Sequence, residues 1–67
     1  MIDYRKLGRM YGLQMSAAAR QKALSERQET TLSGKTMVSI AVGGKASTKA
    51  LVMTADQFNN FRKGFAA

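Results

Sequence analysis

Residues 53–65 read MTADQFNNFRKGF and carry the clearest structural signal in the chain. The hydroxyl of Thr54 can accept a hydrogen bond from the first turn of a helix, and Gln57, three residues later, completes a capping box. Met53 precedes the cap and is placed to pack on Phe58 as a hydrophobic staple. The pattern therefore predicts that a helix begins at Thr54.

The phenylalanines of this helix recur three and four residues apart, so they form one aromatic face that we expect to enter the core. They are Phe58, Phe61 and Phe65. Arg62 and Lys63 follow where the helix dipole favours cations, and Gly64 is a candidate stop signal. We assign the helix to residues 54–66.

The preceding segment changes to the rhythm of a strand. Residues 36–44, TMVSIAVGG, alternate β-branched side chains with others and end in two glycines. A second strand is predicted from about Thr48 to Met53. Residues 29–53 are therefore assigned to a β-hairpin whose apolar face, Val38, Ile40 and Val42, receives the phenylalanines.

The register of this hairpin is predicted from burial. A turn made by Gly43 and Gly44 alone would place two lysines opposite the most apolar face of the chain. A five-residue loop with Lys45 at its tip keeps that face apolar, and a slip of one residue would turn the second strand over. The predicted pairs are Val42 with Thr48, Ile40 with Ala50, and Val38 with Val52.

The N-terminal part, residues 1–28, is predicted to be helical. The run Ala17–Ala19 has high helix propensity and lies within helically spaced apolar residues, which predicts a helix over about residues 14–28. Upstream, Gly8 and Gly12 each cost about 1 kcal/mol relative to alanine in a helix interior, so we expect a short first helix and then a kink or break. Their spacing matches a membrane helix-packing motif, which we interpret as coincidence because charged residues surround it.

These elements predict an α+β fold in one domain, residues 1–67, with an N-terminal helix broken at Gly8 or Gly12, a β-hairpin and a C-terminal helix. A hydrophobic fraction of 45% with 22% charged residues is typical of a folded chain. A chain this short buries only roughly 60% of its unfolded surface, and it has no cysteine for a disulfide. We therefore expect a homo-oligomer.

The charged residues exclude several classes of function. The chain has 11 Lys and Arg against 4 Asp and Glu, with no His and no Cys. Without these two ligands an ordinary zinc site is excluded, and without histidine or paired carboxylates general acid and base catalysis is not expected. We predict no catalytic residue, no metal and no cofactor. No signal peptide or membrane span is expected either, which favours the cytoplasm.

Residues 33–36, SGKT, match the end of a nucleotide-binding P-loop. The full motif needs a glycine where this chain has Glu29, and it must lead into a helix, whereas Thr36 begins a strand pattern. We therefore interpret this segment as a turn with one exposed lysine.

The excess of positive charge favours nucleic acid as the partner, held through phosphates with a salt-sensitive affinity. Only Tyr4 and Tyr11 are left as aromatic residues that could stack on bases. The candidate nucleic-acid-binding residues are Lys45, Lys49, Lys35, Arg5, Lys6, Arg9 and Arg20.

Residues 47–65, STKALVMTADQFNNFRKGF, resemble the strand-to-helix end of the positive-cofactor-four family of single-stranded-DNA-binding coactivators. In that family a basic strand leads into a capped helix that starts with a glutamine and an aromatic residue, matched here by Thr54, Gln57 and Phe58. The resemblance implies single-stranded DNA as the partner, a dimer, and a four-stranded sheet. The sequence itself indicates two clear strands and a candidate third near Thr30–Ser33.

The segments AAARQKALSER, LSGKTMVSIAVGG and TADQFNNFRKGF occur in an order similar to the helix, hairpin, helix order of the W-type head–tail joining proteins of lambda-like phages. This resemblance implies a ring-forming connector of the virion, with its positive charge facing packaged DNA. We predict a non-enzymatic, weakly sequence-specific nucleic-acid-binding protein, with the phage connector as the alternative.

Overall fold

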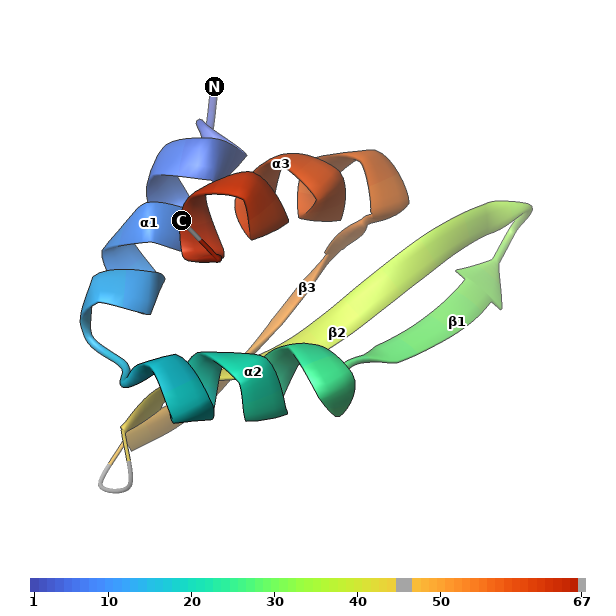
Figure 1. Ribbon diagram of the computed structural model, residues 1–67. Coiled ribbons are helices and arrows are strands. Elements are labelled where there is room, and N and C mark those ends of the chain that lie inside the picture. The colour runs from blue at the N-terminus through green and yellow to red at the C-terminus, as the bar shows by residue number, and fades with distance from the viewer. Residues whose placement is uncertain (45–46, 67) are drawn as a thin grey trace.

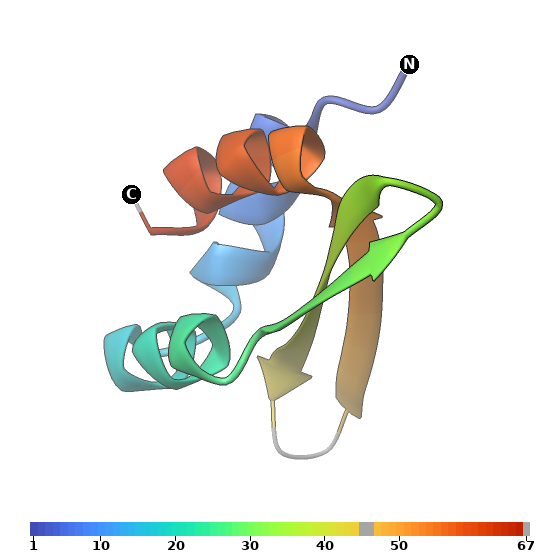
Figure 2. The same ribbon diagram turned by 90° about the vertical axis from the view of Figure 1, so that its right-hand side faces the viewer.

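The computed structural model describes residues 1–44 and 47–66. The fold is α+β, with two N-terminal helices, a three-stranded antiparallel sheet in the order β1-β2-β3, and a C-terminal helix that packs on the first helix (Figure 1). The helices are α1 (Tyr4–Leu13), α2 (Ala17–Ser25) and α3 (Ala55–Phe65), and the strands are β1 (Gln28–Leu32), β2 (Lys35–Gly44) and β3 (Ser47–Thr54). Figure 2 shows all three helices on one side of the sheet, which leaves its other face without a helical cover.

The predicted start of the C-terminal helix is confirmed. The backbone N–H of Gln57 donates to Thr54 Oγ1 at 3.2 Å, and the backbone N–H of Thr54 donates to Gln57 Oε1 at 2.9 Å. These reciprocal bonds satisfy two donors that the helix itself leaves free. Met53 and Phe58, on either side of the cap, are both buried in the same cluster.

The predicted core is confirmed as well. The three phenylalanines of α3 and the three apolar residues of β2 are all buried in one cluster, together with Ala23, Leu24 and Met53. Phe61 is 0% exposed, and its ring lies 5.2 Å from that of Phe65 between centroids. Burying side chains of this size supplies most of the favourable free energy of folding in so small a chain.

The predicted register of the β2–β3 hairpin is wrong by one residue. Val42 pairs with Lys49, Ile40 with Leu51, and Val38 with Met53, and the pairing continues to Gly44 and Ser47. The predicted five-residue loop is therefore too long, and Lys45 lies outside the described residues. Lys49 can face the same side as Val42 because its side chain remains exposed near the end of the strand.

The expected break in the N-terminal helical region is confirmed, but it lies after Leu13 and not at Gly8 or Gly12. Helix α1 runs through both glycines, and the chain turns only after Leu13. Both glycines are buried at the crossing with α3, where a Cβ on Gly8 would lie 2.0 Å from the carbonyl oxygen of Phe61. Gly64 does not end α3, because the helix continues to Phe65. It lies at the crossing instead, where a Cβ would lie 1.9 Å from the carbonyl oxygen of Arg5. The glycines therefore allow the two helices to cross with their backbones in contact.

The sheet has a third strand in place of a simple hairpin. β1 pairs with β2 from Gln28 with Ser39 to Leu32 with Lys35, so that Ser33 and Gly34 form a two-residue turn. Their φ angles of 52° and 78° are both positive, as a type I′ hairpin turn requires. The interpretation of this segment as a turn with an exposed lysine is confirmed.

Candidate nucleic-acid interface

Four cationic side chains border an open hollow of about 440 Å³ where α1 crosses α3. Arg5, Lys6 and Arg9 come from α1, and Lys63 comes from α3. All four are exposed, and we refer to them as the basic seam. Three of the predicted binding residues, Arg5, Lys6 and Arg9, thus lie within about one turn of α1 and border the same hollow.

The glycine contact between the helices creates this arrangement. Gly64 lines the same hollow and lies directly against the backbone of Arg5 and Arg9. Because no side chain separates the helices at this point, cations from segments far apart in sequence border one concave surface. Lys63 joins the set because it is next to Gly64.

The basic seam keeps its positive charge largely uncompensated. Asp3 is the acidic residue that lines the hollow, and its Oδ1 accepts a hydrogen bond from the backbone N–H of Lys6 at 3.2 Å as the cap of α1. Among residues 1–44 and 47–66, the ion pair within 4.0 Å is that of Arg27 Nε with Glu29 Oε2, at 3.5 Å. The seam cations therefore remain available to an external anion.

Two other arginines are occupied by the fold. One guanidinium nitrogen of Arg20 donates to the carbonyl oxygens of Gly12 and Met15, each at 2.7 Å, and so holds the corner between α1 and α2. Arg27 donates to the carbonyl oxygen of Leu24 at 2.7 Å and lies 5.5 Å from the centroid of the Phe58 ring. Arg20, a predicted binding residue, therefore has fewer donors free for a phosphate than the seam arginines Arg5 and Arg9 have.

The remaining predicted lysines do not join the basic seam. Lys35 begins β2 and borders a small hollow at the start of α3, beside Asp56. Lys49 lies on β3 and pairs with Val42, near the opposite end of β2 from Lys35. Lys45 falls outside the described residues.

The open face of the sheet offers little to a nucleic acid. By alternation from the observed register, its β2 and β3 residues include Met37, Ala41, Ala50 and Val52, and Lys35 is its one cation within the described residues. Tyr4 and Tyr11 are half-buried against the core cluster, so each offers only part of its ring for base stacking. The charge on the helical side therefore forms the better candidate interface.

Lys63 is the residue that the sequence-based list missed. Its position beside a glycine signals close helix packing only when the partner helix is known, and the sequence alone favours Gly64 as a stop signal.

Comparison of the chain with protein-family models, with curated proteins and with solved structures gave no match. No helix in the described part of the chain is long and apolar enough to cross a membrane.

Proposed function

We propose that this protein binds nucleic acid without catalysis, through phosphate groups at the basic seam and with weak sequence preference. The observation that supports the proposal is the convergence of Arg5, Lys6, Arg9 and Lys63 on one hollow with a single, already hydrogen-bonded carboxylate. Several exposed cations around one hollow can each contact a phosphate of the same nucleic-acid backbone.

Weak sequence preference follows from the chemistry of the seam. Base reading needs side chains that enter a groove or aromatic rings that stack on bases. The seam offers long flexible cations, and both tyrosines of the chain pack against the core. Binding should therefore depend on charge density and salt far more than on sequence.

The salt dependence of affinity tests the proposal. If the four seam cations neutralise one phosphate each, the logarithm of affinity should fall with the logarithm of salt with a slope of about −3 on single-stranded DNA and about −3.6 on a duplex. Fluorescence anisotropy with one labelled 20-nucleotide strand, alone and annealed, measures both slopes. The same titrations show whether single-stranded DNA is the preferred partner.

A matched pair of double variants locates the surface. Arg9→Ala with Lys63→Ala removes two seam cations, whereas Lys35→Ala with Lys49→Ala removes two exposed cations elsewhere, so both variants have the same net charge. We expect the first to make the slope shallower by about 1.5 and the second to change it by less than about 0.5. Equal losses in both variants would show diffuse attraction with no defined interface, and no binding at low salt would refute the function.

A further inference from the structure

The two edges of the sheet are protected very differently. β1, at one edge, is five residues long, exposed throughout, and carries Glu29. β3, at the other edge, is eight residues long, and its single charge, Lys49, leaves Ala50 to Thr54 uncharged. Proteins usually blunt a free edge with charges, proline or short length, because unpaired backbone groups recruit another strand. The β3 edge has little of this protection.

Large exposed apolar side chains are concentrated on α1 and the segment before it. The large exposed hydrophobic residues among the described ones are Met1, Ile2, Met10, Leu13, Leu32 and Val52. Four of the six belong to α1 and the segment before it, whereas Leu32 on β1 and Val52 on β3 face the open side of the sheet. Such a concentration on one helix is more than the scattered exposure that is normal for a surface.

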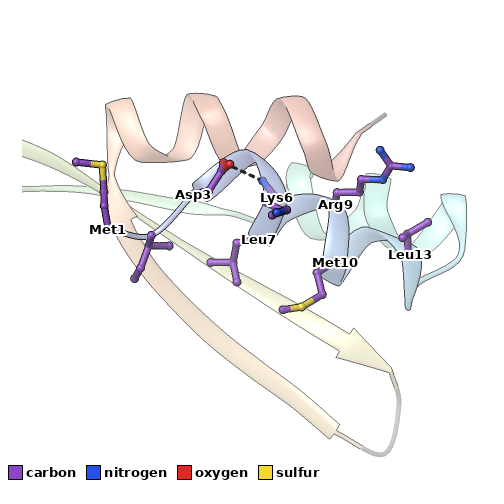
Figure 3. A pocket seen from close by; sticks show the side chains of 8 residues that line it. Met1, Asp3, Lys6, Leu7, Arg9, Met10 and Leu13 are labelled. Atoms are coloured by element: carbon purple, nitrogen blue, oxygen red, sulfur yellow. Dashed lines mark hydrogen bonds between the residues drawn. The ribbon is translucent and has the colours of Figure 1, made fainter.

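The α1 residues border a hollow of about 710 Å³, which we call the α1 hollow. It is lined by Met1, Ile2, Leu7, Met10 and Leu13, with Asp3, Lys6 and Arg9 at its polar parts. Figure 3 shows Leu7 and Met10 pointing from α1 toward the side on which β3 lies. Leu7 of α1 and Leu51 of β3 are both half-buried, and each packs against the core cluster.

We infer that β3 pairs antiparallel with β3 of a second copy of this chain, and that the apolar side chains of Leu7 and Met10, on the β3 side of α1, flank the junction. The inference is independent of the proposed function. An antiparallel edge is self-complementary under two-fold symmetry, so one surface serves both partners. The two three-stranded sheets would become one six-stranded sheet with the helices of both copies on the same side.

Charge favours a second copy as the occupant of this edge. The chain carries a net charge of +7, so two copies can meet only where neither presents cations to the other. Antiparallel pairing centred on Ala50, Leu51 or Val52 places Lys49 opposite an uncharged residue in every case. The basic seam, in contrast, would repel its own copy.

Two exposed apolar residues on opposite edges provide a matched test. Val52 on β3 is 66% exposed and Leu32 on β1 is 61% exposed, and both face the open side of the sheet. Sedimentation equilibrium should give the full chain twice its monomer mass of 7.3 kDa. Val52→Lys should weaken the dimer at least tenfold, whereas Leu32→Lys should leave it within about twofold of the unchanged chain.

Control measurements keep the test decisive. Circular dichroism should show that both variants keep their secondary structure, and Met10→Lys on α1 supplies a second dissociating variant if Val52→Lys fails to fold. Backbone amides of β3 should exchange hydrogen more slowly in the dimer than in the dissociated variant. A monomer at all concentrations, a closed ring of higher mass, or equal dissociation by Leu32→Lys and Val52→Lys would each overturn the inference.

Discussion

Gly8 of α1 touches the backbone of Phe61 in α3 so closely that a Cβ at position 8 would lie 2.0 Å from the Phe61 carbonyl oxygen. Real Cβ atoms do not approach an oxygen to that distance, so any other residue at this position must move one helix. The contact positions the cations of both helices along the basic seam, and it makes stability and the candidate interface depend on the same residue.

Gly8→Ala is therefore expected to destabilise the protein, even though alanine is the better helix former. The gain in helix propensity is about 1 kcal/mol, whereas forcing extra atoms into a packed contact costs typically 1–3 kcal/mol and more against backbone. We expect a net loss of about 2 kcal/mol, measured by urea unfolding. Gly44→Ala is the control, because no atom of the described residues lies within 4 Å of a Cβ there. An unchanged midpoint for Gly8→Ala would mean that the helices do not touch.

Arg20→Ala should destabilise the chain by about 1.5–3 kcal/mol, because two carbonyl oxygens at the end of α1 lose a charged donor. Arg20→Lys should recover only part of this loss, because an ammonium group lacks the planar arrangement of N–H donors of the guanidinium group. Lys22→Ala, an exposed residue on the same helix, should change the unfolding free energy by less than about 0.5 kcal/mol. Thermal unfolding of the three variants measures the difference, and equal melting temperatures for Arg20→Ala and Lys22→Ala would contradict the bonds to the α1–α2 corner.

Phe61→Ala should cost about 3–5 kcal/mol, because the ring is 0% exposed at the centre of the core cluster. In a chain this small that loss approaches the whole stability of the fold. Asn60→Ala, at the adjacent exposed position of α3, should be close to neutral. Chemical denaturation followed by circular dichroism gives both values, and a stable Phe61→Ala variant would place the aromatic face outside the core.

A substitution in the turn between β1 and β2 can raise the stability of the protein. Ser33 has a φ of 52°, a left-handed conformation that asparagine adopts more readily than serine. Ser33→Asn should therefore raise the unfolding free energy by a few tenths of a kcal/mol to about 1 kcal/mol. Gly34→Ala, at a φ of 78°, should lower it by about 1 kcal/mol. Opposite signs in one set of melting curves are the expected result, and a loss in both would argue against the type I′ turn.

The C-terminal helix and its core face were predictable because several local signals agree there. Thr54 and Gln57 fix the start, and the spacing of the three phenylalanines fixes the buried side. The α1 glycines mislead because helix propensity is a local quantity. Only the position of α3 shows that Gly8 and Gly12 are required for close contact, which outweighs their cost within the helix.

The strand register fails for a different physical reason. Both faces of β3 are apolar, with Ala50 and Val52 on one and Leu51 and Met53 on the other, so burial alone does not choose between them. The observed slip of one residue, which pairs Val42 with Lys49, is tolerated because a lysine near a strand end reaches water beyond the core. The sequence predicted three of the four residues of the basic seam. It missed Lys63, because this residue comes close to α1 only through the contact of Gly64 with α1.

The crossing of α1 and α3 also sets an order of events on the ribosome. α1 is synthesised first, yet it packs mainly on α3, which is synthesised last among the described elements. Contacts between segments so distant in sequence close late. Until Phe61 and Gly64 have left the exit tunnel, the nascent chain therefore carries an uncovered N-terminal helix with apolar side chains, which a chaperone can bind and then release once the last helix arrives.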